Sequence, residues 1–268
     1  MTAGSSRTGR MRLDMLVVER GLAATRSQAQ LLIREGHVRV DGERCMQPGE
    51  QIAEGRRIEV EQAPRFVSRG GEKLEAALVE FGIEVQGLVC ADVGASTGGF
   101  TDCLLQRGAA KVYAIDVGKG ILDWRLRSDS RVVVMEETNA RYLDRLPEAM
   151  DLVTVDASFI SLRLLLPVLR AWLAPQGQAV ALIKPQFEAG RAQVKRGGVV
   201  RDAAVHQSVL VEVLTAASHT GLWPHGLVRS PLRGPAGNVE FLAWLRQEAA
   251  PHSIEQIVTL LGLDRIQA

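Results

Sequence analysis

The feature that most constrains this chain is a series of short, continuously apolar segments that alternate with amphipathic ones. Seven such segments lie at residues 88–95, 111–118, 131–139, 151–158, 179–185, 225–231 and 240–246. Helical patterns fall at 72–81, 99–107, 121–128, 161–173 and 201–220. Uninterrupted Val, Ile and Leu runs indicate strands covered on both faces, which is typical of a mostly parallel sheet with helices on either side. We therefore predict an α/β fold for residues 71–250, with ligands at the carboxyl ends of its strands.

A smaller unit is predicted ahead of this sheet, at residues 11–62. Two short helical patterns are followed by alternating strands around an Asp41-Gly42 turn, which is typical of a small α+β domain. Residues 1–49 contain eight arginines, five acidic residues and no lysine, and this positive excess suits a surface that faces phosphates. The remaining boundaries give a flexible tail at 1–10, an interdomain linker at 63–70 and a C-terminal helix or tail at 251–268.

Composition argues against several classes of protein. The three cysteines show no metal-ligand spacing and no disulfide framework, so we predict no metal site and a reducing, cytoplasmic location. The polar, basic start is unlike a signal peptide, and the sequence has no run of about 18 apolar residues that could span a membrane. The aromatic content of 4% argues against an aromatic stacking platform for RNA.

A glycine-rich turn, "DVGASTGGFT" at 92–101, connects the first strand of the sheet to a helix. Glycine allows the backbone to approach a ligand closely, and the helix that follows offers free N–H groups. The spacing differs from G-x-G-x-x-G, so a dinucleotide fits less well than a ligand with a nucleoside and a carboxylate. Asp116, at the end of the second strand, could accept both hydroxyls of a ribose. Together these features favour a pocket for S-adenosylmethionine.

Lys184 occupies an unusual position at the end of a predicted buried strand. Only five of the 32 basic residues are lysine, so the chain otherwise prefers arginine for a positive charge. Arginine cannot lose its proton at physiological pH, whereas a lysine can do so when burial or a second ammonium group disfavours the charge. Lys184 is therefore a candidate for a chemical role.

Five segments taken together carry a family resemblance: "SRGGEKL", "DVGASTGGFTDCLL", "DASFISL", "KPQFE" and "GNVEFL". With them, residues 11–247 resemble the TlyA family of ribosomal RNA 2′-O-methyltransferases, whose members are sometimes labelled hemolysins. The resemblance implies an FtsJ-like catalytic domain, with the Rossmann-like, seven-stranded α/β sheet of class I methyltransferases, and an N-terminal RNA-binding domain of the alpha-L type. It also implies that "RFVS" at 65–68 couples the two domains and affects cofactor binding.

The resemblance further implies a catalytic tetrad of two lysines and two acidic residues. Matched motif by motif, the tetrad falls on Lys73, Asp156, Lys184 and Glu240. The implied reaction is S-adenosylmethionine-dependent methylation of a cytidine ribose in ribosomal RNA, in the large subunit and with the small subunit as a further candidate. Ribosomal RNA or ribosomal subunits are then the partners, and the oligomeric state stays open between a monomer and a weak dimer.

The chemistry explains why such residues are needed. A ribose 2′-hydroxyl is a poor nucleophile, so the site must hold it in line with the methyl group and withdraw its proton as the new bond forms. Lys184 is either the base or a charged group that holds the oxygen while water or Asp156 takes the proton. Lys73 could disfavour the charge on Lys184, whereas Asp156 and Glu240 would stabilise and orient the ammonium groups. The residues alone leave both versions open.

The remaining expected contacts concern the cofactor and RNA. The glycine-rich turn should face the methionine part of the cofactor, with Ser96 and Thr97 as donors. Asp116 should bind the ribose, Asn139 should lie near the adenine, and Asp92 is a candidate partner for the amino group. The predicted cofactor residues are Asp92, Gly94, Ala95, Ser96, Thr97, Gly98, Gly99, Phe100, Asp116 and Asn139. Residues predicted to contact RNA phosphates are Arg10, Arg12, Arg26, Arg34 and Arg39 in the small unit, and Arg191, Lys195 and Arg196 in a glycine-rich loop.

Other functions fit the sequence less well. A non-catalytic RNA-binding factor associated with ribosomes would use the basic small unit but not the tetrad. A membrane-active hemolysin would need an amphipathic cationic helix or a long apolar segment, and the sequence shows neither. A nicotinamide-dependent oxidoreductase fits worst, because the glycine spacing is wrong.

Overall fold

The chain folds into two compact units, residues 1–65 and 66–268, and each is described by itself. The computed structural model describes residues 9–34, 36–60, 65–190, 193–194, 197–234 and 236–262. Within these residues, no helix is long and apolar enough to cross a membrane.

The first unit contains two short helices and two small antiparallel sheets. Leu13, Leu16 and Val17 of the first helix pack against Ile33 of the second to form its core. The Thr25 hydroxyl accepts a hydrogen bond from the Gln28 amide at 3.2 Å, which caps the second helix. The elements are β1 (Arg10–Arg12), α1 (Leu13–Glu19), α2 (Arg26–Arg34), β2 (Val38–Val40), β3 (Glu43–Arg44), β4 (Gln51–Ala53) and β5 (Ile58–Val60).

The sequence predicted one of the two sheets of this unit and not the other. Strands β2, β3 and β5 form one sheet, and the predicted Asp41-Gly42 turn joins β2 to β3 with positive φ angles at both residues. Strands β1 and β4 form the other sheet, with Arg10 opposite Ala53. The sequence prediction did not include this second pair, because three-residue strands are too short to show a clear alternation.

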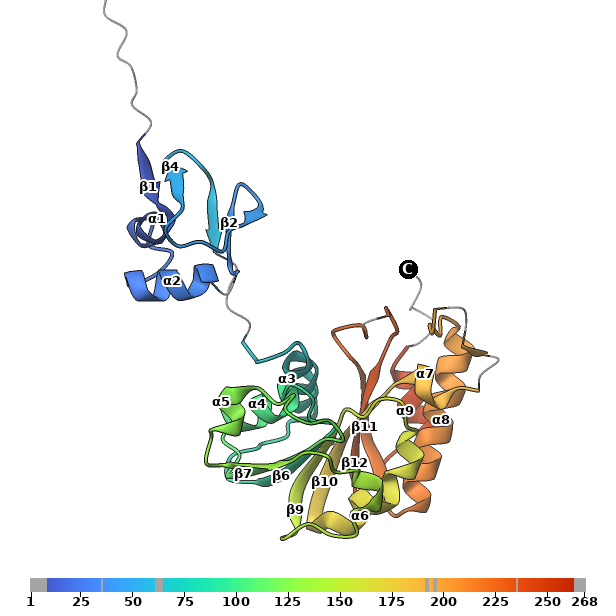
Figure 1. The fold of residues 1–268 in the computed structure, drawn as a ribbon. Helices are drawn as coiled ribbons and strands as arrows, with labels where there is room; N and C mark the ends of the chain where they lie inside the picture. The colour runs from blue at the N-terminus through green and yellow to red at the C-terminus, as the bar shows by residue number, and fades with distance from the viewer. Residues whose placement is uncertain are drawn as a thin grey trace, which may run out of the picture. The chain divides into compact units, whose positions relative to one another are not determined.

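The second unit is built on one seven-stranded sheet (Figure 1). The strand order is β11-β12-β10-β9-β6-β7-β8. Strands β8, β7, β6, β9 and β10 pair in parallel, whereas β12 runs antiparallel to both of its neighbours. The elements are α3 (Gly70–Phe81), β6 (Val89–Val93), α4 (Gly99–Gln106), β7 (Lys111–Ile115), α5 (Trp124–Arg127), β8 (Val132–Met135), η1 (Ala140–Tyr142), β9 (Met150–Val155), η2 (Leu162–Leu164), α6 (Leu166–Trp172), β10 (Leu173–Ile183), α7 (Pro185–Glu188), α8 (Ala203–His219), β11 (Trp223–Arg229), β12 (Phe241–Arg246) and α9 (Ile254–Leu260).

Helices cover both faces of this sheet and create two apolar cores. Helices α3, α4 and α5 lie on one face, and α6, α8 and α9 lie on the other (Figure 1). Along β6, Cys90 belongs to the first core whereas Ala91 and Val93 belong to the second. Successive side chains of a strand point to opposite faces, so a strand covered on both faces must be apolar throughout. This confirms the prediction of an α/β sheet with helices on both sides.

The predicted strands are all present, and α3, α4 and α8 lie where helices were predicted. Two predicted helices are shorter or divided. The Asp123 carboxylate accepts from the Arg125 amide at 2.9 Å, so α5 begins only at Trp124. The segment 161–173 divides into η2 and α6, because Pro167 has no N–H and is tolerated only in the first turn of a helix.

The topology brings the ends of many strands to a single edge of the sheet. Gly94, Asp116, Asp156 and Lys184 directly follow β6, β7, β9 and β10. Glu240 directly precedes β12, and Ile183 pairs with Phe241 in the antiparallel ladder. The start of β12 therefore lies at the same edge as the ends of the parallel strands.

Candidate active site

Two ion pairs join the four residues of the predicted tetrad. The Lys184 Nζ lies 2.5 Å from Asp156 Oδ1, and the Lys73 Nζ lies 2.6 Å from Glu240 Oε2. Lys73 and Asp156 also line one cavity, so the two pairs meet at the same place. The structure thus brings together four residues that are spread over the sequence from 73 to 240.

The ammonium group of Lys184 is enclosed by acceptors. Besides the Asp156 carboxylate, it donates to Ser158 Oγ at 2.8 Å, and it lies 5.9 Å from the centre of the Phe187 ring. The side chain is 9% exposed. A carboxylate, a hydroxyl and an aromatic face are all partners that suit a positively charged side chain.

Lys73 and Glu240 form the more deeply buried pair. Lys73 lies in the first turns of α3, and the Glu240 side chain is only 1% exposed. Gln186 Nε2 donates to the second carboxylate oxygen of Glu240 at 3.3 Å. A Cβ at Gly234 would lie 2.5 Å from Glu240 Oε1, so a larger residue there would have to displace this carboxylate. A buried ion pair is favourable only when its other hydrogen-bonding groups also have partners, and Gln186 is the partner of the second Glu240 oxygen.

The glycine-rich turn passes very close to the Lys184–Asp156 ion pair. Gly94 has a φ of +81°, and a Cβ there would lie 2.7 Å from the backbone oxygen of Asp156. Ser96 also has a positive φ, of +50°. Gly99 begins α4, and a Cβ there would meet Ser68 Oγ at 2.3 Å. The glycines therefore let the turn after β6 approach both Asp156 and the start of α3.

Two cavities flank this turn. The Lys73 cavity, of about 240 Å³, is lined by Lys73, Asp156 and most of the turn. The Asp116 cavity, of about 640 Å³, is lined by Asp116, Asn139 and the segment 156–161. Gly94, Ser96 and Asp156 line both cavities, which are therefore neighbours. An elongated ligand could lie in both and pass over Gly94.

Asp116 has the geometry of a group that can bind hydroxyls. Its carboxylate oxygens accept hydrogen bonds from the amides of Ser96 at 2.8 Å and Gly118 at 2.7 Å. These bonds fix the carboxylate and leave further lone pairs directed elsewhere. Asn139 caps the 3₁₀ helix η1 by accepting from the Arg141 amide at 3.1 Å, and it lines the same cavity.

The predicted cofactor residues are distributed unequally between these cavities. Gly94, Ala95, Ser96, Thr97, Gly99 and Phe100 line the Lys73 cavity. Among the described residues, Asp92 and Gly98 line neither cavity. Gly98 has a φ of +100°, and a Cβ there would meet the Leu126 side chain at 2.2 Å.

Asp92 is fully buried beneath the turn. Its oxygens accept from the hydroxyls of Thr101 at 2.7 Å and Thr154 at 3.2 Å. Burial raises the pKa of Asp92 to about 7, and the nearby Asp156 carboxylate adds to this effect. In this position Asp92 connects β6 to α4 and β9, whose ends carry Gly99 and Asp156.

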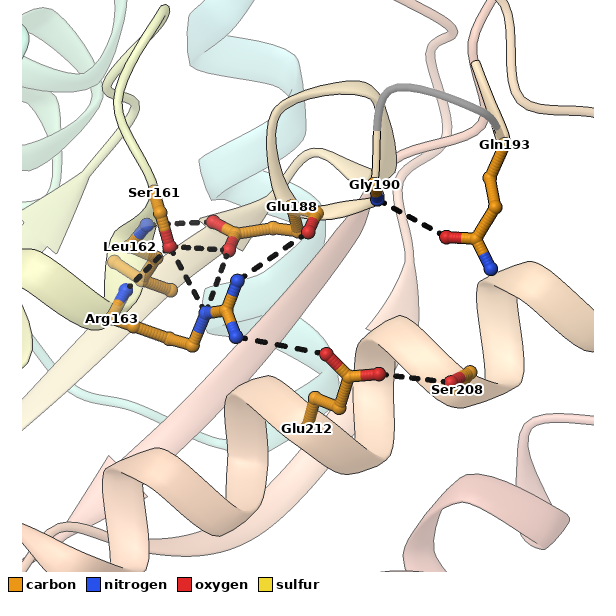
Figure 2. A network of polar contacts seen from close by, with 8 residues as sticks. All are labelled: Ser161, Leu162, Arg163, Glu188, Gly190, Gln193, Ser208 and Glu212. Atoms are coloured by element: carbon orange, nitrogen blue, oxygen red, sulfur yellow. Dashed lines mark hydrogen bonds and ion pairs between the residues drawn. The ribbon is translucent and has the colours of Figure 1, made fainter.

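A second polar network connects the segments that follow Asp156 and Lys184 (Figure 2). The buried carboxylate of Glu188 accepts from the Ser161 hydroxyl and from the Leu162 amide, both at 2.6 Å. Arg163 lies 3.5 Å from Glu188 and 3.6 Å from Glu212 of α8. Glu188 is four residues after Lys184 and Ser161 is five after Asp156, so this network restrains the segments that follow both members of the Lys184–Asp156 ion pair.

The arginines predicted to contact RNA have partners within the small unit. Arg12 and Arg26 both form ion pairs with the buried Asp14, at 2.9 and 3.0 Å. Their side chains remain 39% and 55% exposed, so each can still present N–H groups to solvent. The Arg12 guanidinium, with Gln30 and Arg26, holds the pKa of Asp14 well below its usual range.

The other predicted RNA residues are less informative. Arg10 and Arg39 donate to the backbone oxygens of Gln51 at 3.1 Å and Gly42 at 3.0 Å, and Arg34 is exposed on α2. The remaining three, Arg191, Lys195 and Arg196, lie outside the described residues.

Sequence reasoning did not single out several residues that the site contains. Ser158 and Glu188 lie in the quoted segments "DASFISL" and "KPQFE", but a serine and a glutamate after a strand give no signal of their own. Arg69 and Arg233 line the Lys73 cavity and were not predicted. The described residues include no group of three His, Cys, Asp or Glu side chains that could hold a metal ion.

The sheet order, the glycine turn after its first strand and the acidic residue after its second define a class I methyltransferase. In agreement, the model of the FtsJ-like methyltransferases matches residues 66–247. A model of the S4 domain matches residues 11–58. The chain therefore belongs to the family of FtsJ-like methyltransferases and carries an N-terminal S4 domain.

Individual relatives narrow the position within the family. The chain is 47% identical over 245 residues to the "16S/23S rRNA (cytidine-2'-O)-methyltransferase TlyA" of Mycobacterium tuberculosis, which covers 89% of this chain and 91% of the relative. It is 43% identical to "Hemolysin A" of Brachyspira hyodysenteriae, with 87% and 98% covered. A solved structure, "Putative hemolysin from Streptococcus thermophilus", superposes with a TM-score of 0.71 at 43% identity, over 95% of this chain and 96% of that one. The chain is thus a TlyA and hemolysin A-like member of the family.

Proposed function

We propose that this protein transfers a methyl group from S-adenosylmethionine to the 2′-hydroxyl of a cytidine ribose in ribosomal RNA. The proposed substrate is the RNA of the large subunit, with the RNA of the small subunit as a further candidate, and the name of the mycobacterial relative includes both 16S and 23S rRNA. The observation that carries the proposal is the meeting of the Lys184–Asp156 and Lys73–Glu240 ion pairs beside the glycine-rich turn. An enzyme with this substrate works where ribosomes are made, in the cytoplasm.

The residues of the two cavities fit the cofactor. Asp116 can accept ribose hydroxyls in the larger cavity, where Asn139 also lies, and the turn at Gly94 leaves no Cβ between the cavities. Ser96 and Thr97 line the Lys73 cavity, where the methionine part would lie. When bound, S-adenosylmethionine would supply an electrophilic methyl group on a positively charged sulfur.

The chain itself contributes position and a place for the proton. The Lys184 ammonium group would donate to the ribose 2′-oxygen and hold it in line with the methyl group. The proton of the 2′-hydroxyl becomes strongly acidic once the oxygen starts to form its bond to the methyl group. A carboxylate is therefore a sufficient base for that proton. Asp156, 2.5 Å from Lys184, would take this proton, while Lys73 and Glu240 hold the cavity wall in place.

Transfer of a tritiated methyl group from S-adenosylmethionine to purified ribosomal subunits tests the proposal. Subunits from a strain that lacks this gene are the substrate, and subunits from the parent strain are the control. We expect label in the large-subunit RNA for the wild-type protein and none above background for Lys184→Ala. If the protein is instead a ribosome-associated RNA-binding factor without activity, both proteins should give the same background label. That result would contradict the proposal.

A further inference from the structure

The charge around the Lys73 cavity has a consequence for the substrate. Lys73 and Lys184 are neutralised by Glu240 and Asp156, so the tetrad has no net charge. Arg69 and Arg233 line the same cavity, and both are exposed. Among the described residues, no carboxylate forms an ion pair with either of them, and Arg233 donates only to the backbone oxygen of Gly237, at 3.4 Å. The cavity walls therefore carry a net positive charge that comes from these guanidinium groups.

The two arginines come from different elements at the cavity. Arg69 directly precedes α3, which carries Lys73. Arg233 lies in the connection between β11 and β12, seven residues before Glu240. Each arginine is thus close in sequence to one member of the Lys73–Glu240 ion pair, whose buried contact fixes both elements.

The proposed substrate contains a negatively charged phosphate that these arginines can bind. In RNA, the carbon that bears the 2′-hydroxyl is bonded to the carbon that bears the 3′-phosphodiester. Any ribose that presents its 2′-oxygen to Asp156 and Lys184 therefore brings a phosphate to the same cavity. Arginine suits this partner, because its planar guanidinium group can donate two parallel hydrogen bonds to phosphate oxygens.

We propose that Arg69 and Arg233 form a phosphate subsite that binds the phosphodiesters flanking the methylated ribose. This inference rests on the proposed function and specifies how the substrate is recognised. The site binds a ribose inside a polynucleotide, not a free nucleoside. The subsite differs from the arginines of the small unit, because it acts at the reacting nucleotide. It supplies RNA affinity where the tetrad, being neutral, supplies little.

Steady-state kinetics of the full-length protein test the subsite. Wild type is compared with Arg69→Ala, Arg233→Ala, the double alanine variant, the double lysine variant and Arg145→Ala. Arg145 is an exposed arginine in the connection between η1 and β9 that lines neither the Lys73 cavity nor the Asp116 cavity, and it serves as the matched control. Ribosomal subunits are varied at saturating S-adenosylmethionine and at several KCl concentrations, and cofactor affinity is measured separately by calorimetry.

We expect each alanine substitution to lower kcat/KM for subunits by roughly tenfold, the effect of one lost charge-assisted hydrogen bond. The slope of log kcat/KM against log salt should become shallower by about 0.7 to 0.9 for each lost phosphate contact. The double lysine variant should keep the slope of wild type, and Arg145→Ala should match wild type throughout. The affinity for S-adenosylmethionine should be unchanged in all variants.

Two results would overturn the subsite. The double alanine variant could show the KM and salt slope of wild type. Alternatively, the variants could lose cofactor affinity in proportion to kcat/KM, which would make the arginines ligands of the cofactor carboxylate. Failure of the proposed function is a different outcome, since wild type itself would then transfer no methyl group. Thermal unfolding of each variant checks that these exposed substitutions leave the fold intact.

Discussion

The Nζ of Lys184 lies 2.5 Å from the carboxylate of Asp156, at the ends of two adjacent parallel strands. Strands β9 and β10 hold the two residues in register, because Ala181 pairs with Val155. Glu188 and Ser161 then fix the segments that follow, through a 2.6 Å hydrogen bond. The pair is therefore positioned by the sheet beneath it and by a network beyond it.

The Lys73–Glu240 pair provides the first prediction. Lys73→Met leaves the Glu240 carboxylate buried without its cation, which should cost about 3 to 5 kcal/mol of unfolding free energy. The double variant Lys73→Met/Glu240→Gln removes both charges and keeps an acceptor for Gln186, so most of that stability should return. Urea unfolding measures the stability, and methyl transfer should be lost in both variants. A stable but inactive double variant separates the role of the pair in catalysis from its role in folding.

The glycine turn gives a prediction with an internal control. Gly94 and Gly120 have similar φ angles of +81° and +67°, but only a Cβ at Gly94 would meet another atom, Asp156 O at 2.7 Å. Gly120→Ala should cost about 1 to 2 kcal/mol, from the left-handed backbone alone. Gly94→Ala should cost roughly 2 kcal/mol more, because backbone atoms must move, and should weaken S-adenosylmethionine binding at least tenfold. Equal effects of the two substitutions on stability and on calorimetric cofactor affinity would argue against the close approach.

The network around Glu188 predicts an effect on catalysis (Figure 2). Glu188→Gln replaces the carboxylate that accepts hydrogen bonds from Ser161 and Leu162 with a neutral amide. The change should lower the free energy of unfolding by about 1 to 2 kcal/mol. It should lower kcat more than it raises KM for subunits, because the Lys184–Asp156 geometry loosens while RNA contacts remain. Glu212→Gln changes an exposed member of the same network and should leave both parameters near wild type. A loss of stability with unchanged kcat would limit Glu188 to a structural role.

The pKa of Asp92 predicts a dependence of stability on pH. Its folded value of about 7 exceeds the ordinary value of ~3.9, so between these pH values the folded chain holds a proton that the unfolded chain has lost. The contribution of Asp92 to stability therefore falls as pH rises from about 4 to about 7. Asp92→Asn stays neutral, so its stability relative to wild type should increase over this window, by up to roughly 4 kcal/mol. Urea unfolding at several pH values measures the difference, and a constant difference would contradict the raised pKa.

The strand ends could be predicted from the sequence because apolar runs have clear limits. Asp116, Asp156 and Lys184 each follow such a run directly, and parallel strands place their carboxyl ends at one edge. The pairing of Lys73 with Glu240 could not be derived from local patterns, because 167 positions separate them and the approach of α3 depends on tertiary packing. Only the family resemblance connected these two residues before the structure did.

Local sequence patterns could not predict the side-chain directions and contacts that depend on the tertiary fold. Asp92 and Asp116 both lie at or near strand ends, yet one is fully buried under two threonines and the other lines a cavity. The direction of each side chain relative to the helices decides this difference. Arg12 and Arg26 were predicted as phosphate ligands from charge alone, and their shared contact with Asp14 requires the fold of the small unit.

The most direct test of the account is the map of ribose methylation in ribosomal RNA from living cells. A 2′-O-methyl group blocks alkaline cleavage at its nucleotide, so protected positions can be located along both subunit RNAs. Strains are compared with the gene deleted, restored as wild type, or restored as Lys184→Ala. The account predicts that protection at one or more cytidines disappears on deletion, returns with wild type and does not return with Lys184→Ala. The same protection pattern in all strains would contradict it.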